Sequence, residues 1–375
     1  MVSIPEAVVK VRNFDIVILA IWKAALSRRA RKGGSEYVRL PTMKQVATLA
    51  GVSPMTVSRT LSGTGRVSEE IEARVREAAA TLGYQRNENA RSLRQGRGSR
   101  LIGVAITNLA NPYYGNFAEG VEEAAWEAGL RILLGNTGED PERERQLVAD
   151  FVGRQVEGLI VVPTVQEGSH LDTFALHGLP LVLASRSIRG LGADRVLVDD
   201  VGGSLEGTRQ LLDTGHRRIA FLGMATSVET GRRRFEGFST AFAHRGLVPP
   251  VDLIRVGQQD IGAARQAMIE LLDLESPPSA VFAANNRNAI GALLGIGDYL
   301  RSKREGRMPS VMSFDNFELA SLMPVPVTII DHDPQELGKV ATRLLIQRMD
   351  GSAPQEFVNV QIPTTIHEAT TLSSL

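Results

Sequence analysis

The sequence predicts an α/β protein in which a small, all-α helix-turn-helix head precedes a two-lobed, doubly wound domain of parallel strands. Three observations lead to this fold class. Residues 42–61 show two short helical patterns joined by a glycine turn. From residue 100 onward, short apolar runs alternate with helical segments. The charge also changes along the chain, because residues 1–100 hold 18 of the 42 Lys and Arg but only 8 of the 42 Asp and Glu.

The composition is that of a soluble globular protein. The 375 residues are 43% hydrophobic and 22% charged, which is enough for two or three domains and excludes a disordered or fibrous chain. The absence of cysteine excludes disulfides and thiolate metal sites and agrees with a reducing cytoplasm. A basic end on an acidic body suits a protein that approaches a polyphosphate with one end only.

Residues 1–41 are expected to form an extension outside the folded domains. They contain the apolar run IVILAIW followed by the basic stretch RRARK, a combination that could be mistaken for a signal or anchor. The run is far shorter than the ~20 residues that span a bilayer, and Asp15 and Lys23 flank it, so we expect no membrane segment. The extension is a short extra helix, a disordered arm or sequence upstream of the true start, for which Val38 and Met43 are alternatives.

The head begins with two helices in TMKQVATLAGVSPMTVSRTL, residues 42–61. In the first, apolar residues recur at i, i+3, i+4 and i+7 and predict one buried face: Met43, Val46, Ala47 and Ala50. Gly51 is suited to end this helix. Ser53 can cap the second helix, and Pro54 suits its first position. Val57 and Leu61 then point inward, which leaves a polar outer face.

That outer face fits the major groove of DNA, although an ordinary helical hairpin with a solvated edge is the alternative. The residues on or beside it are Pro54, Met55, Thr56, Ser58 and Arg59. A third helix is expected from a Ser68 cap to Gly83, with acidic residues in its first turn.

Residues 87–94, NENARSLR, are a fourth, short helical candidate. Eight residues are too few for a stable isolated helix, so this piece is expected to order only when docked. An exposed Leu93 between Arg91 and Arg94 suggests a wedge inserted into the minor groove, with a solvated interdomain linker as the alternative.

The βα rhythm after residue 100 predicts two lobes with a cleft between them. The runs LIGVAI, RILL, GLIVV, LVLA, IAFLG, LIRV, AVFAA and SVMSF are expected to be strands, and residues 117–128 and 263–274 have helical spacing. More than eight strands favour two sheets over one. The late strand VTII and the helix after Pro334 are expected to return the chain to the first lobe.

Ligands of such sheets bind at the carboxyl ends of the strands, so the residues that follow each strand are candidates for the site. Arginine, asparagine and aspartate from both lobes could hydrogen-bond vicinal hydroxyls, with a tyrosine ring on the apolar face of a sugar. Taken singly, each of these residues is more often a cap, turn or surface residue. The candidates are Tyr113, Tyr114, Ser185, Arg186, Arg234, Asn285 and Asp315.

The motifs VATLAGVSPMTVSR and LGYQRNENARSL closely resemble the head and hinge of the LacI/GalR family of bacterial transcription regulators. The resemblance runs from about Thr42 to nearly the C-terminus and leaves residues 1–41 outside. It implies a helix-turn-helix DNA-binding head at 42–86, a hinge helix and linker at 87–99, and a periplasmic-binding-protein-like effector and dimerisation domain at 100–375. Lobe 1 would comprise about 100–199 and 332–357, and lobe 2 about 200–331 and 358–375.

The resemblance also implies roles for individual residues. Pro54 and Met55 fall at the variable positions of the recognition helix that select the operator sequence. Leu93 falls on the intercalating hinge leucine and Ala90 on its small neighbour, and we add the flanking Asn87 and Arg94 to the DNA-binding set. In the effector domain, the residues at matching positions are Arg234, Asn285 and Asp315.

Several positions depart from the family pattern. Gln45 and Asn286 stand where an acid is usual, and Ser185 stands where many relatives have aspartate. The segments SFDN and DHDP replace a GFDD-like segment and an RQP-like turn. Two lost acids near the pocket weaken the assignment of a neutral sugar, so a sugar acid, a phosphate-bearing molecule or another ligand stays open.

Two other functions are less well supported. An enzyme would need a catalytic constellation, but GxSxG and GxxxxGK[ST] are missing, and Asp331, His332 and Asp333 are adjacent residues that point to opposite faces of an extended segment. His216 in TGHRRIAFLG is expected to cap a helix or to lie in the turn between a helix and a strand, and not to act as a base. A transport-linked sugar receptor would need an export signal and no DNA-reading head.

We therefore expect a cytoplasmic, ligand-responsive transcription regulator, most readily a repressor, with no catalysis, no metal and no cofactor. Its partners would be double-stranded operator DNA, a small-molecule effector such as a sugar or sugar derivative, and a second copy in a homodimer. The C-terminal sequence contains no leucine heptad, so a dimer is favoured over a coiled-coil tetramer. The effector, the operator, and whether the ligand induces or co-represses are left open.

Overall fold

The computed structural model describes residues 41–63, 67–84, 98–164, 169–172, 176–302, 308–318, 320–323 and 325–368. These residues form two compact units, one within residues 41–84 and the other from residue 98 onward. Within the described ranges, every helix is too short or too polar to span a lipid bilayer.

The first unit is the predicted three-helix head. Its helices are α2 (Met43–Ala50), α3 (Pro54–Ser62) and α4 (Glu69–Leu82). Each helix ends at a glycine in the left-handed conformation, with φ of 66° at Gly51, 66° at Gly63 and 61° at Gly83. The Ser53 hydroxyl accepts the backbone N–H of Thr56 at 3.1 Å, so the predicted start of the second helix is confirmed.

Gln45, one of the departures from the family pattern, completes the start of α2. The backbone N–H of Gln45 donates to the Thr42 hydroxyl at 3.4 Å, and the Gln45 side-chain oxygen accepts the backbone N–H of Thr42 at 2.8 Å. This reciprocal pair is a capping box. A glutamine supplies the acceptor that an acid would supply, so the departure leaves the helix start intact.

The predicted cap of the third helix needs a correction. Ser68 occupies the N-cap position of α4, but its side chain makes no capping hydrogen bond. Three acidic residues follow in the first turn, where their charge interacts favourably with the positive helix end: Glu69, Glu70 and Glu72.

The three helices of the head share a small apolar core. Its buried members are Val46, Ala47, Ala50, Val57, Val75 and Ala78. In addition, the Arg74 guanidinium of α4 donates to the carbonyl of Ala50, in the last turn of α2, where carbonyls lack helical partners. These contacts fix α2 and α4 against α3 and leave the outer face of α3 in solvent.

The second unit begins with lobe 1, a six-stranded parallel sheet in the order β11-β5-β4-β3-β1-β2. The strands are β1 (Leu101–Ile106), β2 (Arg131–Asn136), β3 (Leu159–Val161), β4 (Leu181–Ala184), β5 (Asp194–Val198) and β11 (Asn359–Ile362). Helices α6 (Pro112–Glu127) and α12 (Pro334–Asp350) cover one face, and α7 (Pro141–Gly153) and η1 (Ser169–Leu171) cover the other. Along β1, Ile102, Val104 and Ile106 face the first layer and Ala105 the second.

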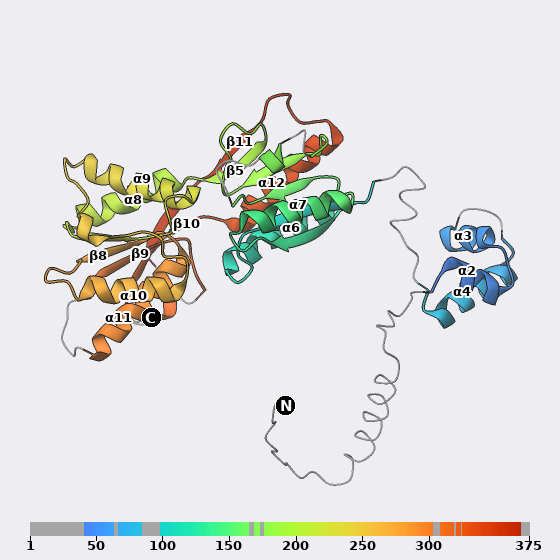
Figure 1. Cartoon of the computed structure of the whole chain (residues 1–375), viewed down its shortest axis with the longest axis horizontal. Helices are drawn as coiled ribbons and strands as arrows, with labels where there is room; N and C mark the ends of the chain where they lie inside the picture. Colours follow the sequence, from blue (N-terminus) through green and yellow to red (C-terminus); the bar gives the residue numbers. More distant parts are fainter. Residues whose placement is uncertain are drawn as a thin grey trace, which may run out of the picture. The chain divides into compact units, whose positions relative to one another are not determined.

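Lobe 2 repeats this architecture with the strand order β12-β10-β9-β8-β6-β7. The strands are β6 (Ile219–Leu222), β7 (Ile254–Arg255), β8 (Ala280–Ala283), β9 (Ser310–Phe314), β10 (Val327–Asp331) and β12 (Thr365–Glu368), of which only β12 is antiparallel to its neighbour. Helices α8 (Asp200–Asp213) and α9 (Glu229–Ala243) lie on one face, and α10 (Ile261–Leu272) and α11 (Asn286–Ser302) on the other (Figure 1). The short helices η2 (Val251–Leu253) and η3 (Ala320–Leu322) complete the lobe.

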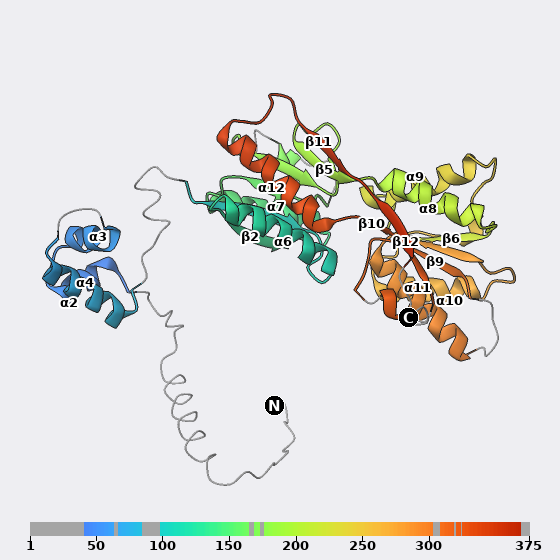
Figure 2. The same cartoon turned by 180° about the vertical axis from the view of Figure 1, so that it is seen from behind.

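The chain passes between the lobes three times, from β5 to α8, from β10 to α12 and from β11 to β12. Figure 2 shows the last of these as a long segment that runs from one sheet into the other. The first and third crossings are joined, because the backbone N–H of Asp199 donates to the carbonyl of Ile362 at 3.0 Å and the Gln361 side chain donates to Asp199 at 2.9 Å. The predicted two-lobed, doubly wound fold is therefore confirmed.

Three details of the sequence prediction were wrong. Strand β5 was not predicted, because its apolar run is short and bounded by aspartates. Residues 358–375 were assigned to lobe 2, but β11 pairs in parallel with β5 in lobe 1 and only β12 lies in lobe 2. The strand VTII also stays in lobe 2, beside β9, so α12 makes the return to lobe 1. Strand β11 is a mostly exposed edge strand with no apolar pattern to reveal its partner.

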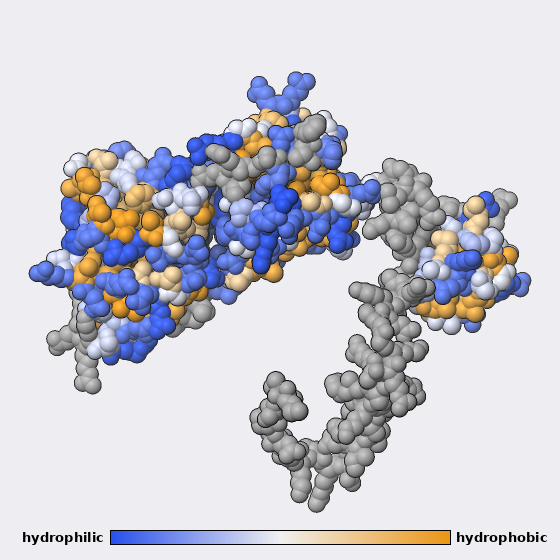
Figure 3. Space-filling view, viewed as in Figure 1, coloured by the Kyte–Doolittle hydropathy of each residue, from blue (hydrophilic) through white to orange (hydrophobic). Residues whose placement is uncertain are grey.

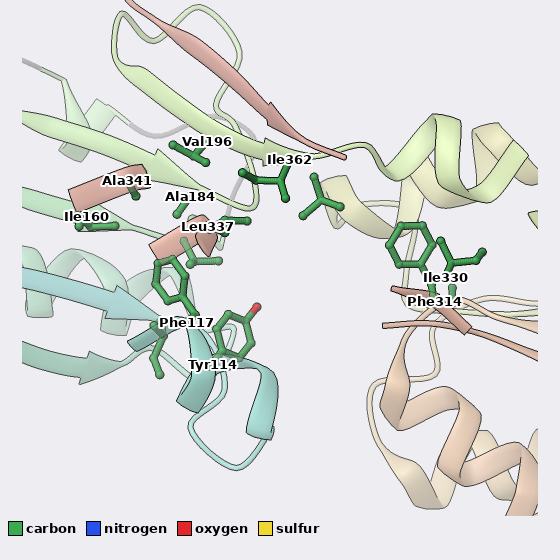
Figure 4. Close-up of a cluster of buried hydrophobic side chains, with 14 of the residues drawn as sticks. Tyr114, Phe117, Ile160, Ala184, Val196, Phe314, Ile330, Leu337, Ala341 and Ile362 are labelled. Carbon is green, nitrogen blue, oxygen red and sulfur yellow. The ribbon is translucent and has the colours of Figure 1, made fainter. Parts of the chain in front are cut away.

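One apolar cluster extends through both lobes and the crossings between them (Figure 4). In lobe 1, Phe117, Ile160 and Leu337 belong to it, and in lobe 2 Phe314 and Ile330. Ile362 lies between the two groups, at the end of β11. On the face in view, Figure 3 shows apolar residues in groups among hydrophilic ones. Most of the large apolar side chains of the described residues are buried in the core.

Helices α6 and α12 approach each other closely at two glycines. A Cβ atom on Gly120 would meet the backbone carbonyl of Gln335, and one on Gly338 would meet the carbonyl of Phe117. Backbone atoms cannot rotate away as a side chain can. The contact therefore requires glycine at both positions.

We predict that Gly120→Ala lowers the free energy of unfolding of the full chain by about 1–3 kcal/mol, because the added methyl forces the two helices apart. Gly115→Ala, in the same helix but with open space around its Cβ, should be neutral or stabilising by about 0.5–1 kcal/mol. Urea denaturation followed by circular dichroism measures both. Equal stability of the two variants would contradict the close contact.

Candidate ligand cleft and nucleic-acid interface

A cavity of about 1160 Å³ lies between the lobes, at the carboxyl ends of the strands. Its lining comes from both lobes, and most of the lining residues are polar. The charged residues among the lining are Glu139, Arg186, Asp200, Arg234, Arg287 and Asp315. A cavity of this size and chemistry accommodates a small polar molecule.

The structure brings all seven predicted effector residues to this cavity. Tyr113 and Tyr114 lie in the first turn of α6, Ser185 and Arg186 follow β4, and Arg234 lies on α9. Asn285 follows β8 and Asp315 follows β9. The prediction that they share one site is confirmed, and their role in binding stays a prediction.

Arg234 is the centre of the charged network in lobe 2. Its Nε donates to Asp200 at 2.8 Å, and its Nη1 donates to Asp315 at 3.0 Å and to the carbonyl of Ala284 at 2.6 Å. The guanidinium also lies over the ring of Phe314, at 3.7 Å from the ring centroid. All three charged groups are buried, so the network is a fixed part of the cleft.

The charges of this network depend on one another. Burial raises the pKa of Asp200, and the Arg234 guanidinium opposes that rise. Burial alone would lower the pKa of Arg234, but Asp315 and Asp200 raise it well above its ordinary value. Arg234 therefore stays charged, and one oxygen of Asp315, Oδ1, has no hydrogen-bond partner within the described residues.

Arg186 forms a second ion pair on the lobe 1 side. Its Nη1 and Nη2 each donate to a carboxylate oxygen of Glu139 at 2.7 Å, a bidentate arrangement, and Nη1 also donates to the carbonyl of Pro163 at 3.1 Å. Glu139 and Asp200 were missed from sequence. Each follows a strand, β2 and β5, so the rule that found the other candidates would have found both if the strand ends had been placed correctly.

Ser185 and Asp315 occupy equivalent places in the two lobes, each directly after a strand, and share an uncommon backbone conformation. Their φ angles are +60° and +65°, in the left-handed region that residues other than glycine rarely adopt. Backbone hydrogen bonds hold both, from Ser185 N–H to Val196 at 2.8 Å and from Asp315 N–H to Ile330 at 3.0 Å. Strain held in place by neighbouring strands is frequent at ligand sites.

Direct hydrogen bonds between described residues join the lobes across the cleft. The side-chain amides of Asn111, at the start of α6, and Asn286, at the start of α11, exchange hydrogen bonds of 2.9 and 3.3 Å. Glu229 of lobe 2 accepts the backbone N–H of Ser187 in lobe 1, and accepts its hydroxyl at 2.7 Å. An acid in place of Asn286 could not exchange hydrogen bonds in this way while ionised.

Tyr113 connects the cleft with His332. Its hydroxyl lies 3.1 Å from the Ser185 hydroxyl and 3.4 Å from His332 Nε2. His332 Nδ1 lies 3.8 Å from Asp315, too far for a hydrogen bond. Burial lowers the pKa of His332 and Asp315 opposes this, so the ring is neutral at pH 7. Burial also raises the pKa of Tyr113, which stays protonated.

The rest of the DHDP segment has structural partners. Asp333 caps α12 by accepting the backbone N–H groups of Gln335 and Glu336, each at 2.9 Å. Asp331 accepts the side-chain amide of Asn316 at 3.0 Å. No group of three or more potential metal ligands is found in the part of the chain that the structure describes.

The head presents the predicted reading face on α3. Pro54, Met55 and Arg59 are exposed, and Thr56 and Ser58 are half-buried beside them. The Thr56 hydroxyl lies 2.9 Å from that of Ser53, so part of its hydrogen-bonding capacity is used at the start of the helix. The hinge candidates Asn87, Ala90, Leu93 and Arg94 lie outside the described residues.

Comparisons with known proteins decide the family. Residues 42–87 match the model for "Bacterial regulatory proteins, lacI family", and residues 99–370 match that for "Periplasmic binding proteins and sugar binding domain of LacI family". The chain belongs to the LacI family. It is therefore a DNA-binding transcription regulator with a ligand-binding domain.

Relatives in the LacI family match over most of their length. The chain is 32% identical to the ribose operon repressor of Escherichia coli over 314 residues, 83% of this chain and 93% of that protein. It is 30% identical to the HTH-type transcriptional regulator GalS of Salmonella typhimurium over 328 residues, 87% of this chain and 95% of that protein. The structure of the lac repressor dimer bound to operator and the anti-inducer ONPF aligns with a TM-score of 0.70 at 25% identity, covering 89% of this chain and 100% of that one.

His332 gives a pH dependence that can be measured. An unfolded histidine titrates near pH 6.5, and the folded pKa is lower, so below pH 6.5 the unfolded state binds more protons than the folded state. The contribution of neutral His332 to the free energy of unfolding is therefore fully present above pH 6.5. It is lost as the pH falls toward the folded pKa. Between pH 7.5 and 5.5, His332→Gln should lose less unfolding free energy than the wild type, by up to about 1.4 kcal/mol.

Urea denaturation of the full chain at the two pH values provides this measurement. His244→Gln, at an exposed position that ends α9, serves as the control and should follow the wild type. Parallel pH profiles for the wild type and His332→Gln would contradict the assignment.

Proposed function

We propose that this regulator is a cytoplasmic repressor without catalytic activity, whose affinity for operator DNA is controlled by a small polyhydroxylated effector bound between the lobes. The observation that carries the proposal is the joining of two features in one chain. One is a helix-turn-helix with an exposed outer face on α3, and the other is a polar interlobe cleft with the buried Arg234 network.

The cleft supports an effector with several hydroxyl groups. Arg234 and Asp315 are held rigidly, and Asp315 Oδ1 and Arg186 Nε are buried atoms that lack a hydrogen-bond partner within the described residues. A ligand hydroxyl can donate to the first and accept from the second, which removes the cost of leaving both unpaired. The Tyr113 ring beside them offers an apolar face.

Regulation needs two conformations, and the two lobes can supply them as an open and a closed arrangement. The lobes are joined by three crossings, and their contact across the cleft depends on a few hydrogen bonds, those of Asn111 with Asn286 and of Ser187 with Glu229. A ligand that binds both lobes favours the closed arrangement, and it can act on DNA affinity only through its difference in affinity for the two arrangements.

The DNA-binding form is proposed to be a homodimer on a pseudo-palindromic operator, as the lac repressor dimer in complex with its operator supports. Pro54 and Met55 would read base edges, and Arg59 would contact the phosphate backbone or a base. The wedge role of Leu93, with Asn87, Ala90 and Arg94 around it, stays a prediction from the resemblance.

Selection of bound fragments from a random pool of double-stranded DNA should return a pseudo-palindrome. We expect Arg59→Ala to weaken binding of the selected fragment about tenfold or more, because it removes a charged contact from the outer face of α3. Arg76→Ala, at an exposed position on α4, is the matched control and should bind within about twofold of the wild type. No enriched sequence, or an equal loss in both variants, would count against the reading face.

Asp315→Asn tests the effector side. The amide keeps the shape of the carboxylate but loses its charge, so the concentration of effector that changes operator binding should rise about tenfold or more. Loss of this charge also lowers stability, so circular dichroism first establishes that the variant is folded. Operator affinity of the folded variant without effector should be unchanged. Asp298→Asn, on α11 and paired there with Arg265 and Arg301, is the control. A response of Asp315→Asn at the wild-type concentration would remove Asp315 from the site.

A further inference from the structure

One cation in the cleft differs from the others. Arg186 is paired with Glu139, and Arg234 is paired with Asp200 and Asp315. Arg287 also lines the cavity but forms no ion pair and no hydrogen bond with the residues that the structure describes. Its Nε is buried and has no partner.

An arginine in such a position is costly unless something balances it. A half-buried guanidinium loses part of its hydration and regains stability when an anion or acceptor meets its N–H groups. The described residues provide this guanidinium with no acceptor. The counter-charge is therefore expected to come from outside the chain.

Among the described residues, no carboxylate is paired with Arg287, although Asp315 lines the same cavity and its Oδ1 has no hydrogen-bond partner. Arg287 lies in the first turn of α11, where the helix dipole favours an anion, while the backbone N–H of Asn288 already donates to the Asn285 side chain at 2.8 Å. Its neighbour Asn286 is neutral and engaged with Asn111. Asn285, which precedes it, and Gln259, which also lines the cavity, are neutral amides. The lining carboxylates are engaged elsewhere, in the pairs with Arg186 and Arg234.

We propose that Arg287 binds an anionic group of the effector, so that the effector is a small polyhydroxylated molecule with a carboxylate or phosphate. The hydroxyl groups lie at the Arg234 and Asp315 network, and the acidic group lies at the start of α11. Arg287 is then a specificity-determining residue, which separates an acidic ligand from its neutral analogue. This inference rests on the proposed function, because it assigns a ligand class to the same cleft.

The test compares neutral and anionic members of matched pairs on the full chain at constant ionic strength. The probes are ribose and ribose 5-phosphate, glucose with glucose 6-phosphate and gluconate, galactose and galacturonate, and inorganic phosphate alone. Thermal shift identifies the ligand, and isothermal titration gives its Kd. The phosphate and carboxylate members decide which acidic group is preferred.

We expect at least one anionic member to stabilise the wild type while its neutral partner does not. Arg287→Gln should weaken that ligand about 10- to 100-fold, and Arg287→Lys, which keeps the charge, should weaken it less. Arg301→Gln, at the exposed far end of the same helix, should bind as the wild type does. These results together would support the assignment.

Other outcomes overturn it. Binding of a neutral member as tight as that of its anionic partner, or anionic binding unchanged in Arg287→Gln, excludes the anion site but leaves the proposed function intact. Failure of every member of the panel to bind also counts against the ligand class. Anionic binding that requires Arg287 but never changes operator affinity would instead refute the regulatory function while supporting the site.

Discussion

The ion pairs of buried Arg234 with Asp200 and Asp315 are the interaction on which the ligand domain depends. They join α9 to the first turn of α8, directly after the chain enters lobe 2, and to the end of β9. Removing either carboxylate or the guanidinium leaves a buried charge without its full complement, which typically costs 3–5 kcal/mol. The same groups face the cavity, so the interaction that orders the crossing region also sets the chemistry of the cleft.

Much of this protein could be predicted from local rules. The head follows from helix caps and glycine stops, because each signal lies beside the helix end that it marks: Gly51, Ser53 and Gly83. Six of the seven cleft residues follow from the ends of strands, because carboxyl ends of parallel strands meet at one edge. Arg234, which lies on α9, follows from its position in the family pattern. Family resemblance added the direction of the chain through the two lobes.

The features that were missed depend on distant partners. Strand β11 is an edge strand whose register is set by β5, more than 150 residues earlier in the sequence. Glu139 matters only because Arg186 lies opposite, and Asn286 only because Asn111 faces it from the other lobe. No local pattern records which side chain will be opposite another. The isolation of Arg287 is likewise a property of the assembled cleft, since the sequence alone does not show which charges are already paired.

The three crossings between the lobes limit how the ligand domain can move. A single connection would allow one lobe to rotate freely against the other. Three connecting segments, two of them joined through Asp199 and Ile362, resist torsion and leave bending as the soft mode. Motion along one coordinate makes every closure event geometrically alike, whatever molecule causes it. Ligands of different shape can then differ in how often they close the domain while producing the same output, which lets the binding site change over evolution without redesign of the DNA-binding machinery.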